Sequence, residues 1–272
     1  MAVDAARRAL EESSVGRDDL SAVTLGTTTP PLEENDLAAQ LVEMLGLPRT
    51  VRTTVSTQST RAGTAALRIA MDARDGPAMA IATDCPVGNP DDSQGHGAGA
   101  GAIAMVLTDD GSATIRDAGS YAREFPGTRY RERGETTVKH YDATAYERQA
   151  YAATIAGALE DLDPTATALA PTAPDGALPY RAANETDRSF DVYQDASSLG
   201  DTGAASPYFG LTAAWADGVE DVVVVGYGDG AVADAVEIAG TAPVSEPRET
   251  VDLAYSEYLR MRGEIVTTGG GK

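Results

Sequence analysis

A segment that changes from strand to helix, TVSTQSTRAGTAAL at residues 54–67, holds the side chain best placed to do chemistry. The β-branched run 50–56 predicts a strand and residues 60–73 predict a helix, so Thr60 falls at the start of the helix. A helix N-terminus favours negative charge and lowers the pKa of a thiol held there, which suits acyl transfer. Here the side chain is a hydroxyl, and no cysteine lies nearby. Thr60 is therefore either an unusual nucleophile or a position whose nucleophile has been lost.

Few other side chains could share such a reaction. Cys85 is the only cysteine, which excludes disulfides within the chain and thiolate-rich zinc sites. We interpret it as a small residue at a strand end rather than a displaced nucleophile. His96 and His140 are the only histidines, and they fall in a loop and in a polar stretch. Conventional acid–base chemistry is therefore restricted.

An acidic cluster and a glycine-rich turn have simpler interpretations. The cluster is better explained by solvated turn residues than by a metal site, and no metal is expected; its members are Asp84, Asp91 and Asp92. The turn GYGDG at 226–230 lacks the strand-then-helix context of a phosphate-binding loop, so we reject dinucleotide binding.

The net charge of the chain indicates the kind of solvent that surrounds the protein more than the kind of ligand that it binds. The chain of 272 residues has a formal charge of −21, with 42 acidic against 21 basic residues, and only Lys139 and Lys272 are lysines. A dispersed acidic surface of this kind resembles proteins of salt-loving archaea, in which concentrated salt screens the repulsion. The absence of a basic cluster argues against nucleic acid. No apolar run approaches the ~18 residues of a membrane span, and the N-terminus lacks a signal-peptide pattern, so we expect a cytoplasmic protein.

Strand and helix patterns alternate along the chain and repeat in two halves, which predicts an α/β fold with mostly parallel sheets. Each half ends in two strands joined by a glycine-rich turn. We divide the chain into 1–121, an N-terminal half; 122–144, a polar insertion or lid; 145–240, a C-terminal half; and 241–272, a helix and flexible tail. Expected strands are 21–26, 50–56, 78–83, 100–107, 113–121, 165–170, 221–228 and 231–238. Expected helices are 2–12, 35–45, 60–73, 145–161, 178–186, 203–217 and 250–262.

Five segments, spread in order over nearly the whole chain, carry a family resemblance. They are MAVDAARRAL (1–10), RAGTAAL (61–67), ASPYFGLTAAW (205–215), VVVVGYGDGAVADAVEI (222–238) and YSEYLRMRGE (255–264). Together they resemble the thiolase superfamily and, within it, archaeal hydroxymethylglutaryl-CoA (HMG-CoA) synthase. The resemblance implies a thiolase-like fold, with two duplicated halves in a layered αβαβα architecture, and a homodimer.

The resemblance also implies where the family's catalytic groups should lie. The family uses a cysteine that takes the acetyl group, a glutamate that acts as acid–base and a histidine that positions the second substrate. Their positions fall on Thr60, Thr28 and Thr172, and a family asparagine falls on Asp201. By contrast the family's backbone-shaping glycines are kept: Gly26, Gly63, Gly176, Gly200, Gly203, Gly228 and Gly230. Candidates for a ligand pocket are Arg61, Gly176, Asp201, Gly228 and Gly230.

An alcohol needs an adjacent base to act as a nucleophile, and a threonine hydroxyl accepts no proton near pH 7. The leading hypothesis is therefore an HMG-CoA synthase-like protein without condensing activity, acting as a non-catalytic subunit or as an acyl-CoA binder. The alternative is an active acyltransferase or HMG-CoA synthase with relocated catalytic groups. No cofactor is expected beyond an acyl-CoA ligand.

The resemblance implies three further features at edges and ends. The family begins with a strand in the middle of the first sheet, and this chain has no candidate for it. The family dimer leads us to expect pairing through an edge strand at 50–56. Residues 258–272 resemble the junction to a zinc-ribbon/OB-fold module, so such a protein, or a thiolase, is the expected companion. The run YAREFPGTRYRER (121–133) is equally consistent with a contact to a partner or CoA phosphates and with a solvated lid.

Overall fold

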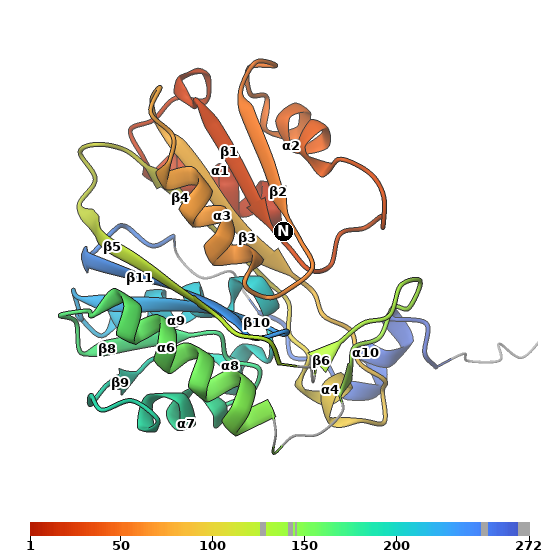
Figure 1. Cartoon of the computed structure of the whole chain (residues 1–272). Coiled ribbons are helices and arrows are strands. Elements are labelled where there is room, and N and C mark those ends of the chain that lie inside the picture. Colours follow the sequence, from red (N-terminus) through yellow and green to blue (C-terminus); the bar gives the residue numbers. More distant parts are fainter. Residues whose placement is uncertain (126–128, 141–143, 145, 246–249, 266–272) are drawn as a thin grey trace, which may run out of the picture.

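The computed structural model describes residues 1–125, 129–140, 144, 146–245 and 250–265, and it contains two main β-sheets (Figure 1). The first has the strand order β2-β1-β3-β4 and the second the order β5-β11-β10-β8-β9. The first-sheet strands are β1 (Ala22–Gly26), β2 (Arg52–Ser56), β3 (Ala78–Asp84) and β4 (Gly101–Leu107). The second-sheet strands are β5 (Ala113–Ala122), β8 (Ala168–Pro171), β9 (Asp191–Val192), β10 (Val222–Gly228) and β11 (Val232–Gly240).

Helices form three layers around these two sheets, which confirms the predicted αβαβα architecture (Figure 1). The outer face of the first sheet is covered by α1 (Ala2–Glu12) and α2 (Leu37–Leu45). Between the sheets lie α3 (Ala62–Met71) and α9 (Ser206–Ala216). The outer face of the second sheet is covered by α6 (Ala153–Leu162) and α7 (Leu178–Asn184). No described helix is both long and apolar enough to cross a membrane.

Strand β10 shows how the sequence specifies this layering. Its residues, VVVVGYG, are all buried, and it pairs in parallel with β8 and antiparallel with β11. Val223 and Val225 pack into the core under α6 and α7, whereas Val222 and Val224 pack into the central core. A strand buried on both faces needs an unbroken apolar run rather than alternation, which is why four valines stand in a row.

The two halves share a topology but differ at one sheet edge. In each, a parallel strand is followed by an antiparallel one: β3 by β4, and β10 by β11. Strand β5 then pairs antiparallel with β11 and forms the edge of the second sheet, although the boundary expected after residue 121 assigned this strand to the first half. Among the described residues, no strand pairs with the outer side of β4.

This topology corrects the expected place of the strand with which the family fold begins. In the second sheet the strand that opens the half, β5, lies at the edge beyond the antiparallel β11. By the repeat of the two halves, the corresponding place in the first sheet lies beside β4, at the edge and not in the middle as expected.

Most predicted elements are present, and the differences lie at helix ends and in short segments. The expected helix 145–161 begins with the π-helical segment η2 (Tyr146–Ala152), and the helix expected at 250–262 is α10 (Tyr255–Met261). Of the expected polar insertion 122–144, residues 126–128 and 141–143 lie outside the described residues, as does the tail from 266. The short elements that were not predicted are η1 (Arg17–Asp19), α4 (Ser93–Gly97), β6 (Arg129–Tyr130), β7 (Lys139–His140), β9 and α8 (Ala196–Leu199), and the expected helix 203–217 begins with the 3-10 turn η3 (Gly203–Ala205).

Candidate functional site

Thr60 lies directly before α3, in the turn that follows β2, where the sequence predicts a nucleophile. Its side chain is buried, and its hydroxyl donates a hydrogen bond to the main-chain oxygen of Tyr227, 2.6 Å away. Tyr227 is on β10, so this bond connects the two halves. The acceptor is a carbonyl oxygen that cannot take up a proton near neutral pH, so the contact orders the hydroxyl without activating it.

Close backbone approach explains why glycines surround this turn. A side chain at Gly63 would come within 2.1 Å of the Ala204 carbonyl oxygen, and one at Gly228 within 2.4 Å of the Ser59 hydroxyl. Any larger residue at either place would force the central helix away from the second half. These glycines keep the turn and the end of β10 in contact, and thereby position Thr60.

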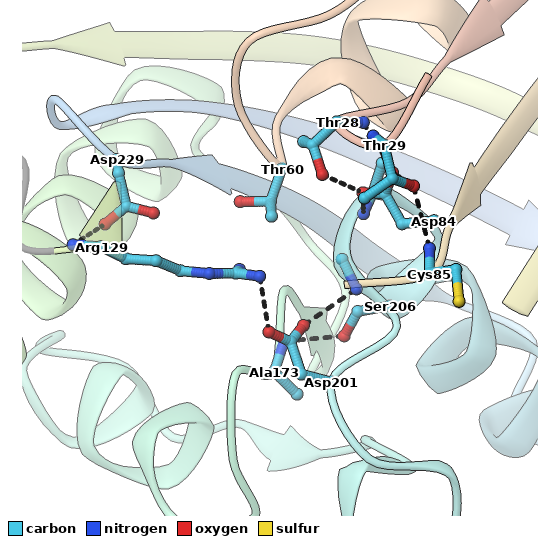
Figure 2. Close-up of polar contacts among 12 residues, drawn as sticks. Thr28, Thr29, Thr60, Asp84, Cys85, Arg129, Ala173, Asp201, Ser206 and Asp229 are labelled. Atoms are coloured by element: carbon cyan, nitrogen blue, oxygen red, sulfur yellow. Dashed lines mark hydrogen bonds and ion pairs between the residues drawn. The ribbon is translucent and has the colours of Figure 1, made fainter. Parts of the chain in front are cut away.

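Thr28 lies among hydrogen-bond donors to Asp84, a carboxylate at the end of β3 (Figure 2). The Thr28 hydroxyl and amide donate to Asp84 at 2.8 and 2.6 Å, and the hydroxyls of Thr27 and Thr29 donate at 2.9 and 3.0 Å. The amide of Ala204, from the second half, donates at 2.7 Å. Asp84 is 1% exposed. Its oxygens are occupied by these donors, so we assign it to holding the two halves together rather than to accepting a substrate proton.

This arrangement corrects the interpretation of the acidic cluster as solvated turn residues. Asp91 is exposed, and Asp92 caps α4 by accepting from the amide of Gly95, but Asp84 is buried and structural. Within the part of the chain that the structure describes, no group of acidic, histidine or cysteine residues could hold a metal ion.

Thr172 is fully buried at the end of β8, and its backbone and side chain hold β8 against β10. Its amide donates to Val225 and its hydroxyl accepts from the amide of Tyr227 at 2.9 Å. The Tyr151 hydroxyl donates to its carbonyl oxygen. Thr172 therefore contributes packing and backbone hydrogen bonds where the family resemblance implies a histidine.

A buried ion pair, which the sequence did not indicate, lies in the same region. Arg129 donates through Nη2 to Asp201 at 2.8 Å, and both side chains are less than a tenth exposed. The amide of Arg129 donates to Asp229, and Figure 2 shows the Arg129 side chain extended from Asp229 toward Asp201. Arg129 belongs to the segment 122–144 that was expected to be a polar insertion or lid, yet its side chain is buried. Arg129 and Asp201 are 72 positions apart in the sequence, and only the fold brings them together.

Burial raises the pKa values of both carboxylates. Desolvation raises the pKa of Asp229 to about 6, and the Arg129 guanidinium opposes this shift. Desolvation also raises the pKa of Asp201, against the opposing charge of Arg129 and the amide of Gly203. A carboxyl group with a pKa of about 6 can exchange a proton near neutral pH, which makes Asp229 the acid–base candidate that sequence reasoning missed.

The remaining candidates lie apart from this cluster or have structural partners. Arg61 forms an ion pair with Asp234 at 2.8 Å, and Arg68 pairs with the other oxygen of the same carboxylate, so Arg61 already has a partner within the protein. Gly176 and Gly230 are exposed. The exposed Cys85 follows β3, and in Figure 2 its thiol points away from Thr60.

The two histidines give no base near Thr60 among the side chains that the structure describes. His96 is exposed and contacts the Pro90 carbonyl and the ring of Tyr255. The His140 side chain lies outside the described residues.

The duplicated halves, with the Thr60 turn between them, define a thiolase-like fold. No family model matches the chain. It is similar to HMG-CoA synthases from Pyrobaculum arsenaticum (26% identical, covering 97% of this chain and 84% of the relative) and Picrophilus torridus (27%, 96% and 83%). The resemblance to archaeal HMG-CoA synthases is therefore confirmed over nearly the whole chain.

Solved structures confirm the fold. An HMG-CoA synthase complexed with CoA superimposes with a TM-score of 0.73 at 18% identity, over 89% of this chain and 70% of that one. A tetronic acid condensing enzyme superimposes with a TM-score of 0.67 at 18% identity, over 88% and 86%.

Proposed function

We propose that this protein is an HMG-CoA synthase-like protein that has lost condensing activity and acts as an acyl-CoA binder or non-catalytic subunit. One observation carries the proposal: each of the three family catalytic positions holds a threonine whose polar atoms have partners within the protein. Thr60 donates to Tyr227, Thr28 to Asp84, and Thr172 accepts from Tyr227. Losing catalytic groups that act as a unit costs roughly three to six orders of magnitude in rate.

The test combines turnover with binding. Purified protein in high-salt buffer is given acetyl-CoA and acetoacetyl-CoA, and HMG-CoA is measured by mass spectrometry, while calorimetry measures binding of acetyl-CoA. The proposal expects saturable binding without product. Product formation at enzyme-like rates would contradict it, and an absence of binding would leave the non-catalytic subunit as the remaining form of the proposal.

An active enzyme with relocated groups is the second candidate, and the cluster of Asp229, Arg129 and Asp201 favours it. Asp229, with a pKa raised to about 6 by desolvation, would serve as the base. This candidate expects turnover that depends on pH near 6 and is lost in Asp229→Asn. The first candidate expects no turnover in either protein.

We also propose a homodimer through β2. Strand β2 is an edge of the first sheet. The amide of Arg52 donates to Ser21 and the carbonyl of Ser56 accepts from Thr27, both toward β1. Because backbone direction alternates along a strand, the amides of Thr53 and Val55 face the open edge.

The remaining proposals concern companions and surroundings. Exposed apolar side chains near α10, including Val251, Leu253 and Met261, support contact with a companion such as a thiolase or a zinc-ribbon/OB-fold protein. The net charge of −21 supports a cytoplasm rich in salt.

A further inference from the structure

A short hairpin, formed by β6 and β7, connects the middle of the chain to the region around Thr60. Its two strands pair antiparallel through two residues each. Arg129 and Val138 of this hairpin are buried, whereas residues 131–136 are exposed. A two-stranded ribbon of this length is not stable by itself, so the hairpin depends on its contacts with the rest of the protein.

Two of these contacts place the hairpin beside the family position Thr28. The Arg131 guanidinium donates to the main-chain oxygen of Thr28 at 2.6 Å. The amide of Val138 donates to the main-chain oxygen of Val87, in the loop that follows β3, at 2.9 Å. Segments that are held by few contacts and are largely exposed open locally at low free energy. The hairpin is therefore a part of the protein that can move while the two sheets stay intact.

Arg129 spans two segments that both lie at the start of α3. Its amide donates at 3.1 Å to Asp229, which is two positions beyond Tyr227, the acceptor of the Thr60 hydroxyl. Its guanidinium pairs with Asp201 in the loop that leads into η3, and η3 contacts α3. The extended side chain thus crosses the space in front of the helix start, and Figure 2 shows it along this path with Thr60 next to it.

Other sides of the turn are closed by parts of the protein that cannot easily move. No side chain would fit at Gly63 or Gly228, because neighbouring atoms already approach both positions closely. Asp84 and its donors occupy another side (Figure 2). Thr60 is 4% exposed, so a ligand must displace a neighbouring group to reach its hydroxyl. The flexible side chain of Arg129 can leave without breaking a sheet or a core helix.

We propose that Arg129 is an internal gate. With the hairpin closed, its side chain occupies the approach to Thr60, and a ligand reaches that hydroxyl only after the pair with Asp201 breaks and the hairpin moves. A ligand that binds the open state alone has its affinity reduced by the fraction of molecules that are open. Because the gate controls entry to the site of the proposed function, it is tested with a small reagent whose access does not depend on acyl-CoA binding.

The test places a thiol behind the gate and measures how fast iodoacetamide reaches it. Thr60→Cys is made in a Cys85→Ser background, because Cys85 is an exposed thiol, and labelling in high salt is followed by intact mass. We expect labelling at least tenfold slower than that of Cys85 in the unaltered protein. Adding Arg129→Ala/Asp201→Ala should accelerate it at least tenfold. This pair of changes removes one charge of each sign, so neither charge stays buried alone and the change in rate reports access.

Two controls separate opening of the gate from other effects. Arg133→Ala removes an exposed arginine of the same hairpin and should change the labelling rate of Thr60→Cys by less than twofold. Val224→Cys, in the central core, reports unfolding and should stay unlabelled with or without the pair.

Equal labelling of Thr60→Cys with and without the ion pair would overturn the proposal. So would an acceleration at Val224→Cys as large as that at Thr60→Cys, because the rate would then report unfolding. Fast labelling of the variant without the ion pair, together with no binding of acetyl-CoA in calorimetry, would support the gate and count against the acyl-CoA binder.

Discussion

The hydroxyl of Thr60 donates its hydrogen bond to the main-chain oxygen of Tyr227, so the position where a thiolate would attack is part of the contact between the two halves. The turn, the start of α3 and the glycines that shape them are all present. The side chain at this position is an alcohol that donates its proton to a carbonyl oxygen. The structure therefore keeps the turn and the glycines of the thiolase-like fold, with a hydrogen-bonded threonine hydroxyl at the start of the helix.

Breaking the buried ion pair should be strongly destabilising. Arg129→Met leaves the Asp201 carboxylate buried without its 2.8 Å partner, so we expect a loss of about 3–5 kcal/mol in unfolding free energy. The double variant Arg129→Met/Asp201→Leu should recover most of that loss. Arg133→Met, which breaks an exposed pair with Glu33, should cost less than about 1 kcal/mol. Urea unfolding in high salt measures all three, and equal losses for Arg129→Met and Arg133→Met would refute the assignment.

Asp84 should be the most sensitive acidic residue in the region between the halves. Asp84→Asn replaces one oxygen that accepts hydrogen bonds with a group that donates them, and it leaves Thr28 or Ala204 facing another donor. We expect a loss of at least about 3 kcal/mol. Asp91→Asn, seven positions away and exposed, is the control and should stay within about 0.5 kcal/mol. Thermal unfolding of the two variants side by side distinguishes a buried structural carboxylate from a solvated one.

The pH dependence of stability should reveal Asp229. Its pKa is about 6 in the folded protein against an ordinary 3.8, so between these values the folded state binds more protons than the unfolded state. Stability contributed by this group is therefore present at low pH and is lost as pH rises toward 6. Asp229→Asn removes the effect, so its melting temperature relative to the unaltered protein should rise between pH 4 and pH 7. A constant difference across that range would show that the carboxyl group has an ordinary pKa.

Dimerisation through β2 is open to a test with two proline variants. Val55→Pro removes an amide on the open edge and should convert the dimer to a folded monomer. Thr54→Pro removes an amide that faces β1 and should destabilise the first sheet itself. Light scattering in high salt, with circular dichroism as the check on folding, separates the two effects. A Val55→Pro protein that dimerises normally would place the interface elsewhere.

Local patterns were sufficient to predict the layers. The apolar run of β10 and the amphipathic helix α1 are both visible in sequence, and so is the turn that holds Thr60. The ion pair between Arg129 and Asp201 could not be predicted, because it joins a polar insertion to a distant loop. Asp84 was misinterpreted for a similar reason, since its donors come from loops more than fifty residues away.

The sheet that a strand joins is equally hard to predict from the local sequence. The pattern at 113–121 indicates a strand but not its neighbour, and pairing with β11, more than a hundred residues later, decides the sheet. Register and partner depend on the completed fold, whereas the existence of a strand depends on the local sequence.

Intact-mass analysis after incubation with acetyl-CoA tests most directly the claim that the covalent chemistry is absent. The unaltered protein in high salt should show no mass increase of one acetyl group, and neither should Thr60→Ser, because both hold an alcohol with no base beside it among the described side chains. Thr60→Cys should acquire the adduct if the helix N-terminus and surrounding frame are intact. An acetyl adduct on the unaltered protein that disappears in Thr60→Ala would show that Thr60 is an active nucleophile and would contradict this account.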